Sequence, residues 1–398
     1  MKRSFSLLMI VLILVSLAAC NKNDGYDYVS PYATNTQNTV VEKPPVTEIL
    51  PVDQKPLVTV SLPVTTQTEK ADDGTEIFRY TYQNMFLILP ESDVGDDVIT
   101  NFISKRDPAD ATASALLESA KEAYIPGAAW TPYVYQTIYE PMRIDNGVLS
   151  LFGRNTVFSG SSHPETNYLS ISYDLVTGQV LTLESVLSVG ASAETISNLL
   201  IAELNKIAVD KQFYEGFEST VKDRFFHDYL HDTDWYFSKD GLTFFFSPYE
   251  IAPYSVGVVT ATIPYEKLVE ILDDAYFPAE KETAAGKLFG QLFTMEAAAE
   301  YTQSADVVLE SDGDRILLYT DHYVQDIRIV SGSWSADGNT FTPECTVFAA
   351  DGLTQHDAIM LQTTLKPSAP TLQISYTTGE NTVTAYIAGT PGTSVTLK

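Results

Sequence analysis

The chain has 398 residues, and with 44% hydrophobic and 11% aromatic residues it can bury a substantial core in two domains or three. Its net charge of -28 argues against nucleic acid as a partner and against binding to anionic surfaces by charge alone. Such a charge keeps an exposed extracellular protein soluble, and it leaves a cationic partner as the electrostatic alternative.

The first 20 residues have the pattern of a secretion leader. A basic start is followed by an apolar run from Leu7 to Val15, which is too short to span a membrane. The following Leu17-Ala18-Ala19-Cys20 resembles the lipobox of bacterial lipoproteins. That resemblance implies cleavage before Cys20 and lipidation of its thiol, so we expect a protein anchored in the lipid bilayer of the cell membrane and facing the extracytoplasmic side. An ordinary signal peptide or a coincidental cysteine is the alternative.

The predicted lipid anchor also decides whether a disulfide can form, because Cys20 and Cys345 are the only cysteines in the chain. If Cys20 carries lipid, Cys345 has no partner within the chain and no intramolecular disulfide forms. Cys345 stands in a strand-like run, and we expect a buried small apolar residue there rather than a nucleophile.

Composition divides the remainder of the chain into three parts. Residues 21–56 are rich in Asn, Thr, Pro and Val without a period, which predicts a disordered tether. Residues 57–278 contain some stretches with the 3.6-residue apolar period of a helix and others with the two-residue period of a strand. They are therefore predicted to form an α+β domain, with helices packed on antiparallel sheet. Residues 279–398 contain short alternating runs punctuated by Asp-Gly pairs, which predict a smaller all-β domain, a sandwich or a barrel.

The elements of the α+β part are assigned from periodicity and turn signals. In chain order they are strands at 58–62 and 78–82 joined around Asp72-Asp73-Gly74, helices at 94–104 and 110–123, strands at 130–139, 148–152 and 168–173, a hairpin return at 180–183 after a Thr177-Gly178 turn, and helices at 196–207 and 214–230. The stretch from Trp235 to Leu268 then predicts a strand, an Asp240-Gly241 turn, a strand, an aromatic loop, a strand and a helix that begins at Pro264.

Seven short strands are predicted in the all-β part. They lie at 305–309, 315–319, 326–330, 342–349, 358–365, 372–376 and 382–387. A linking helix is predicted over Phe289 to Tyr301. Such a module is more often a binding or spacer domain than an enzyme.

Several runs in the α+β part are similar to one known family. These are Gly241 to Gly257 (GLTFFFSPYEIAPYSVG), Ile263-Pro264-Tyr265 with Leu268, and Asp174 to Gly178 with Leu181-Thr182-Leu183. They resemble the C-terminal extracytoplasmic domain of RsiV-type anti-sigma factors, which are lysozyme-sensing membrane proteins; the same domain precedes the catalytic domain of some peptidoglycan deacetylases. The likeness covers roughly residues 57–277 and is specific in 168–268. It implies an α+β fold, and a lysozyme-like protein or wall glycan as ligand.

The chain departs from that family at one turn. Relatives commonly have Gly-Gly-Ala-His-Gly before the hairpin, whereas this chain has Ser159-Gly160-Ser161-Ser162-His163-Pro164. His163 is kept, but Pro164 cannot copy a glycine with positive φ. The family position makes His163 a candidate ligand-binding residue, with a solvent-facing loop histidine as the alternative. A cytoplasmic anti-sigma segment, a clear spanning helix and the metal motifs of a deacetylase are not found, so neither transmembrane signalling nor deacetylation is expected.

Two further groups of residues are candidates for a site. His227 and His231 stand at i and i+4 on a predicted helix, as zinc ligands do, with Asp232 or Asp234 as a third ligand. Near a helix end, however, histidine also serves as a simple surface cation, so these two are weak metal candidates. Tyr249, Glu250 and Tyr254 combine flat rings with a carboxylate, which suits a carbohydrate or a protein surface; rings that close the core are the alternative.

These patterns together favour a non-enzymatic, membrane-anchored lipoprotein that acts as a cell-envelope binding module and needs no cofactor. Its ligand would be a cationic lysozyme-like protein, which an acidic surface attracts, or peptidoglycan. The alternatives are a metal-assisted cell-wall hydrolase that uses His227 and His231, and a structural spacer of an envelope complex.

Overall fold

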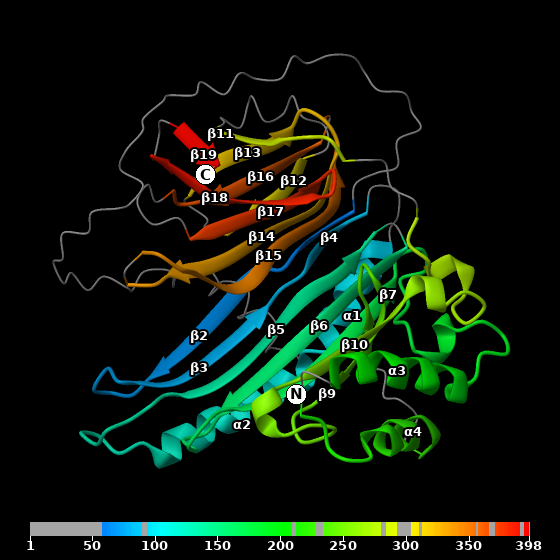
Figure 1. The fold of residues 1–398 in the computed structure, drawn as a ribbon. Helices are drawn as coiled ribbons and strands as arrows, with labels where there is room; N and C mark the ends of the chain where they lie inside the picture. Colours follow the sequence, from blue (N-terminus) through cyan, green and yellow to red (C-terminus); the bar gives the residue numbers. More distant parts are fainter. Residues whose placement is uncertain are drawn as a thin grey trace, which may run out of the picture. The chain divides into compact units, whose positions relative to one another are not determined.

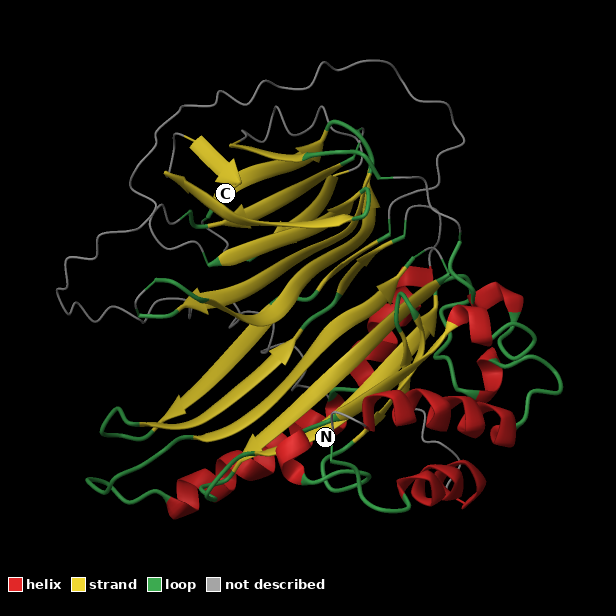
Figure 2. Ribbon diagram, in the orientation of Figure 1, coloured by secondary structure: helices red, strands yellow, loops and turns green. Residues whose placement is uncertain are grey.

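The structure is a computed structural model, and it describes residues 58–89, 94–145, 147–208, 212–227, 234–279, 284–292, 304–309, 313–336, 338–355, 357–365, 371–390 and 394–397. The predicted leader, the lipidation site at Cys20 and the predicted tether lie outside these residues. Strands make up most of the described fold, in mainly antiparallel sheets, with helices in the first two thirds of the chain (Figures 1 and 2). No described helix is long and apolar enough to cross a membrane.

A five-stranded sheet is the frame of the first part, in the order β2-β3-β5-β6-β7. Its strands are β2 (Val64–Lys70), β3 (Glu76–Gln83), β5 (Tyr133–Ile144), β6 (Val148–Phe158) and β7 (Glu165–Asp174). The β3–β5 pair is parallel and the other pairs are antiparallel. Helices α1 (Val94–Ser104) and α2 (Asp107–Ala123) match the two predicted helices and lie along this sheet (Figure 1). Ala113 and Ala120 of α2 are buried against Phe78 and Tyr80 of β3.

The predicted hairpin around Asp72-Asp73-Gly74 has a different first strand. The turn is present, but β3 pairs with β2, whereas Val58 to Leu62 contributes β1 (Thr59–Ser61) to another sheet. Strand β2 reads Val-Thr-Thr-Gln-Thr-Glu-Lys and is almost wholly exposed, so it lacks the apolar alternation that marks a strand in a sequence. The buried β1, which does show an apolar run, pairs far away in the chain instead.

A second, three-stranded sheet is built from the aromatic stretch that follows. Its strands are β8 (Trp235–Phe237), β9 (Gly241–Phe246) and β10 (Val259–Pro264), in the order β10-β9-β8 and as predicted. All six residues of β9 are buried, because one face packs against helices α3 (Ala193–Ala208) and α4 (Phe217–His227) and the other meets the large sheet. On that second side, the Phe152 ring of β6 contacts the rings of Tyr236 and Phe245.

The helix predicted from Pro264 is not formed. Only a 3-10 turn (η3, Tyr265–Lys267) follows β10, although Leu268 and Leu272 are buried. Glu270 has a φ of 71°, and the backbone N–H of Ser188 donates to the Ile271 carbonyl oxygen at 2.9 Å. Hydrogen bonds to a distant segment therefore replace those of a helix. Further 3-10 turns lie at Glu184–Val186 (η1), Tyr254–Val256 (η2) and Asp274–Tyr276 (η4).

The last third of the chain is all β among its described residues, and two sheets share one core there. The four-stranded sheet has the order β11-β13-β16-β12, and the seven-stranded sheet the order β19-β18-β17-β14-β15-β1-β4. The strands are β11 (Leu288–Leu292), β12 (Ser304–Val308), β13 (Asp314–Thr320), β14 (Val324–Trp334), β15 (Phe341–Leu353), β16 (Ala358–Thr363), β17 (Leu372–Thr378), β18 (Asn381–Thr390) and β19 (Ser394–Leu397). All seven predicted strands are confirmed. The predicted linking helix is wrong at its start, because Leu288–Leu292 pairs with β13.

The seven-stranded sheet also contains strands from the beginning of the fold. Strand β1 lies between β15 and β4 (Phe86–Ile88), with Val60 opposite Ala349 on one side and Leu87 on the other. The Gln83 side-chain amide donates to the Thr346 carbonyl oxygen at 3.3 Å, and the Thr346 N–H donates to the Glu140 carboxylate at 3.1 Å. This sheet runs across the predicted boundary at 278/279, and the division into two domains there stays a prediction.

Candidate functional site

Two loops that lie far apart in the sequence meet in an exposed aromatic cluster, which we define as His163, Tyr249 and Tyr254. The rings of Tyr249 and Tyr254 stack with centroids 5.5 Å apart and an interplanar angle of 28°. The His163 ring lies 5.9 Å from that of Tyr254. Tyr249 is 68% exposed and Tyr254 is 50% exposed, so these rings do not close the core. Three of the four candidate binding residues from the sequence therefore come together.

The loop that carries both tyrosines is fixed by its own hydrogen bonds. After β9 the backbone N–H of Tyr249 donates to the Ala252 carbonyl oxygen at 3.0 Å, and that of Glu250 donates to Ser247 at 3.1 Å. Ile251 and Ala252 are buried and anchor the loop in the core. In this loop Tyr249 adopts a φ of 74°, a left-handed backbone conformation that costs an L-residue roughly 1–2 kcal/mol. Strain at an exposed aromatic residue is typical of functional loops.

Glu250 points away from the cluster and into an ion-pair network. The Arg224 guanidinium of α4 lies 2.5 Å from a Glu250 oxygen and 2.5 Å from an Asp234 oxygen. The other Glu250 oxygen accepts the Ser247 N–H at 2.8 Å. Burial raises the pKa of the Glu250 carboxyl above its ordinary value, and the Arg224 guanidinium opposes that rise. The structure thus places Glu250 as a residue that positions the loop.

The other loop is the turn between β6 and β7, which carries His163. Gly160 adopts a φ of 84°, which an L-residue rarely does, and the Ser161 hydroxyl donates to the His163 carbonyl oxygen at 2.7 Å. The His163 side chain is exposed, and its Nδ1 lies 3.3 Å from the Pro164 carbonyl oxygen. Pro164 lies just before β7, so its missing N–H removes no hydrogen bond from the sheet. The imidazole remains available to a ligand beside the Tyr254 ring.

The remaining sequence candidates are placed elsewhere. His227 is the last residue of α4, and its predicted partner His231 lies outside the described residues. Among the residues that the structure describes, no three His, Cys, Asp or Glu side chains form a group that could hold a metal ion. Cys345 is buried in β15, as predicted, with its Sγ 3.3 Å from the Ser331 hydroxyl, and burial raises the pKa of its thiol.

Arg224 is the residue at this site that sequence reasoning missed. It stands in a polar helix, and neither Asp234 nor Glu250 lies at a helical spacing from it. Only the packing of α4 beside β9 brings the three together, with the guanidinium 5.4 Å from the Phe246 ring centroid. No local pattern in the sequence could have indicated this network.

Residues 185–266 match a family described as "Protein of unknown function (DUF3298)". That segment contains Tyr249 and Tyr254 but not the turn of His163. A solved structure of a DUF3298 family member from Bacteroides fragilis is similar at 16% identity and a TM-score of 0.42, covering 56% of this chain and 96% of that one. For a DUF3298 family protein from Pseudomonas aeruginosa the values are 18%, 0.36, 56% and 97%. No curated protein matches the chain.

Proposed function

We propose that the chain is a membrane-anchored lipoprotein whose globular part is a non-enzymatic binding module of the cell envelope, and that the aromatic cluster contacts the ligand. The observation that carries this proposal is the stack of exposed rings from two distant loops, with Tyr249 held in a strained backbone conformation. Core packing does not account for rings that remain half exposed or more. Tyrosine is one of the residue types that most often dominate the energy of a binding surface.

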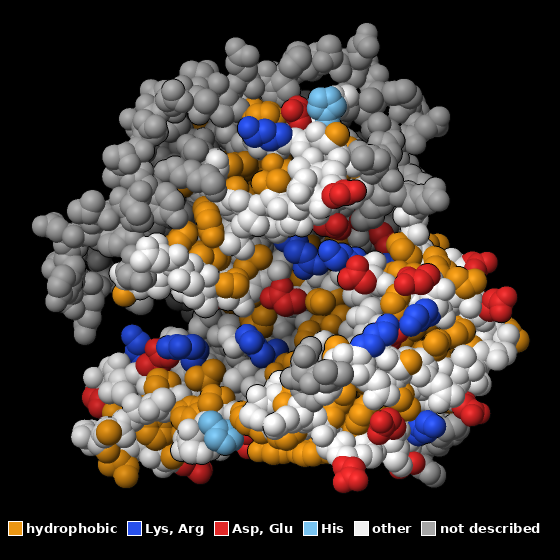
Figure 3. Space-filling model, viewed as in Figure 1, with side chains coloured by type: hydrophobic (Ala, Val, Ile, Leu, Met, Phe, Trp, Pro, Cys, Tyr) orange, Lys and Arg blue, Asp and Glu red, His pale blue; other side chains and the backbone are white. Residues whose placement is uncertain are grey.

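The proposed ligand is a basic, lysozyme-like wall hydrolase. The resemblance to the RsiV-type extracytoplasmic domain supports this choice, and the specific part of that resemblance overlaps the DUF3298 match. A net charge of -28 attracts a basic protein over long range. Acidic side chains are spread over the face seen in Figure 3 rather than gathered in one block, so charge steers the encounter while the rings define the contact.

Binding is tested with the chain that lacks residues 1–20, against a basic lysozyme and against purified peptidoglycan at low and moderate salt. We expect saturable lysozyme binding that weakens as salt rises, because ions screen exposed charges beyond about 10 Å at 0.1 M. Tyr254→Ala should weaken binding about tenfold or more, which corresponds to about 1.4 kcal/mol or more.

Ile125→Ala is the matched control, because Ile125 is 66% exposed and lies in the turn after α2, outside the cluster. It should leave the affinity unchanged within about twofold, as exposed positions away from an interface do. Binding to peptidoglycan alone, lost in Tyr254→Ala, would make the glycan the ligand. Lysozyme binding that Tyr254→Ala and His163→Ala both leave intact would exclude the cluster as the contact surface.

A further inference from the structure

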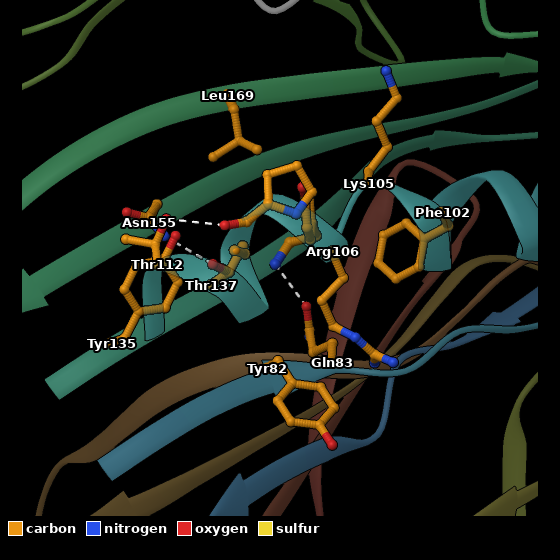
Figure 4. Close-up of a pocket in the computed structure, with 13 residues that line it drawn as sticks. Tyr82, Gln83, Phe102, Lys105, Arg106, Thr112, Tyr135, Thr137, Asn155 and Leu169 are labelled. Atoms are coloured by element: carbon orange, nitrogen blue, oxygen red, sulfur yellow. Dashed lines mark hydrogen bonds between the residues drawn. The ribbon is translucent and has the colours of Figure 1, made fainter. Parts of the chain in front are cut away.

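A cavity of about 260 Å³ lies between the large sheet and the junction of α1 and α2 (Figure 4). It is separate from the aromatic cluster, since none of its lining residues belongs to that cluster. The walls come from strands β3, β5, β6 and β7 of this sheet, from helices α1 and α2, and from the residues between the two helices. The lining residues are Tyr82, Gln83, Phe102, Lys105, Arg106, Pro108, Ala109, Thr112, Tyr135, Thr137, Tyr139, Asn155 and Leu169.

The hollow results from three short residues on the sheet, Thr137, Gly153 and Asn155, and from the break between the helices. Thr137 and Asn155 pair side by side, and Gly153 pairs between Tyr139 and Leu169. A Cβ on Gly153 would lie 2.7 Å from the Tyr139 ring, so the absence of a side chain there lets that ring lie across β6. Above this floor α1 ends at Ser104 and α2 begins at Asp107, which leaves the sheet uncovered at the corner.

The walls are mostly apolar, with a few polar groups at fixed positions. Phe102 and Tyr139 meet edge to face with centroids 5.2 Å apart, and Tyr135, Leu169 and Pro108 complete the apolar surface. This volume is just below the range of about 300–1,000 Å³ for drug-sized ligand sites, so the cavity suits a smaller molecule.

Three polar groups of the lining keep hydrogen-bonding capacity for a ligand. The Asn155 amide N–H donates to the Thr137 hydroxyl at 2.9 Å, which leaves the Thr137 hydroxyl hydrogen and the Asn155 Oδ1. The Tyr139 phenol also lines the cavity, and burial raises its pKa. Gln83 is already engaged at both ends of its amide, because its Oε1 accepts the Tyr139 N–H at 2.6 Å and its Nε2 donates to the Thr346 carbonyl oxygen.

The charge of the lining is opposite to that of the whole chain. Lys105 and Arg106 line the cavity and no Asp or Glu does, although the chain has 52 acidic and 24 basic residues. The Arg106 guanidinium lies 4.5 Å from the Tyr82 ring centroid and donates to the Asn84 side chain at 2.9 Å. Asp110 is 3.6 Å from Arg106 and partly offsets its charge, whereas Lys105 is exposed and its side chain runs in the opposite direction to that of Arg106 in the view of Figure 4.

We propose that this cavity binds a small apolar carboxylate, an aromatic ring acid, whose ring lies among Phe102, Tyr135 and Tyr139 and whose carboxylate is attracted by the positive charges of Lys105 and Arg106. The apolar walls exclude a sugar, which needs a hydrogen-bond partner for each hydroxyl. The cationic mouth selects an acid over a neutral ring of the same shape. The Thr137 and Tyr139 hydroxyls donate to the carboxylate or to a ring substituent.

The test uses calorimetric titration of the chain without residues 1–20 with 2-naphthoic acid and with its neutral counterpart 2-naphthamide. We expect one saturable site for naphthoate, with the amide about fivefold to tenfold weaker, since an ion pair at a half-open site contributes about 1 kcal/mol. Lys105→Gln with Arg106→Gln should bring the naphthoate affinity down to that of the amide.

A filling variant separates cavity binding from surface binding. Ala109→Leu places a larger side chain on the cavity wall from α2 and should lower naphthoate affinity at least tenfold, with the thermal midpoint unchanged or raised, because it fills space without removing a hydrogen bond. Ala111→Leu is the matched control, since Ala111 is exposed on the same helix and does not line the cavity. The proposal is overturned if naphthoate does not bind, if acid and amide bind equally, or if Ala109→Leu binds like the control.

Discussion

At the scale of single residues, Tyr249 combines backbone strain with exposure, and the two can be separated by substitution. Tyr249→Gly removes the ring and the penalty of a φ of 74°, whereas Tyr249→Ala removes only the ring. Because the ring is 68% exposed, little burial is lost in either variant. We expect Tyr249→Gly to be more stable than Tyr249→Ala by about 0.5–1 kcal/mol in denaturant unfolding. Equal stabilities would mean that the loop does not hold this φ in solution.

Glu250 gives a second prediction at the residue scale, on the pH dependence of stability. Because burial raises the pKa of Glu250 in the folded chain, the folded state holds this proton more tightly than the unfolded state. Its contribution to stability is therefore fully present below the unfolded value of about 4.3 and is lost as pH rises through the higher folded value. Measured from about pH 4 upward, the free energy of unfolding of the wild type minus that of Glu250→Gln should fall.

The control for this measurement is Glu184→Gln, which removes one carboxylate from an exposed position in η1. This variant measures the effect of losing one exposed carboxylate over the same range of pH. If the free energy of unfolding of the wild type minus that of Glu250→Gln instead rises with pH, the Arg224 guanidinium lowers the pKa of Glu250 by more than burial raises it. That outcome would contradict the prediction.

At the scale of elements, the sequence predicts what local periodicity encodes. Helices α1 and α2, the strands β8, β9 and β10, and all seven strands predicted in the last third are present, because each carries its apolar pattern and its turn residues within a short window. The Thr177-Gly178 turn is also present, with Gly178 at a φ of 74°. The segment after it makes only a single bridge, from Val180 to Tyr173, so the predicted return strand of the hairpin is not formed, although β7 pairs with β6 along its other edge.

The errors share one cause, which is competition from contacts distant in sequence. The exposed, Thr-rich β2 carries no apolar signal, and hydrogen bonds to Ser188 replace the helix expected after Pro264. The candidate site was predictable only in part for the same reason. Aromatic residues in a proline-rich loop marked Tyr249 and Tyr254, but the contact of His163 with Tyr254 and the Arg224 network depend on how β6, β7 and α4 pack. The cavity depends on the parallel β3–β5 pairing and on the break between α1 and α2. No local sequence pattern predicts that these features enclose a cavity.

An element-scale prediction follows from Gly241 at the start of β9. A Cβ on this residue would lie 2.1 Å from the Ile263 carbonyl oxygen, which is backbone and cannot turn aside. Gly241→Ala should therefore push β9 and β10 apart and destabilise the chain by about 2 kcal/mol or more, measured by denaturant unfolding. Gly127→Ala is the comparison, because Gly127 also has a positive φ but meets nothing within 4 Å; it should cost only about 1 kcal/mol. Equal costs would show that strain, not close approach, sets the penalty.

At the scale of the whole molecule, β1 and β4 bind the beginning of the fold to its end. Val60 is fully buried between Ala349 of β15 and Leu87 of β4, so β1 completes the core of a sheet in which every strand except β1 and β4 comes from the last third of the chain. The first part of the chain carries both the aromatic cluster and the cavity. The aromatic cluster, the cavity and the described sheets thus belong to one compact unit of the chain.

This arrangement predicts that damage to β1 is felt in the last third of the chain. Val60→Asp buries an unpaired charge, which should cost about 3 kcal/mol or more and raise hydrogen exchange in β14 and β15 as well as in β4. Val64→Asp makes the same substitution four residues later in the exposed strand β2, where Val64 is 39% exposed, and should change neither stability nor exchange appreciably. Exchange measured by mass spectrometry on both variants decides the point. If Val60→Asp leaves β15 as protected as in the wild type, the last third is stable without β1, and the sheet contact across 278/279 is a consequence of folding rather than a condition for it.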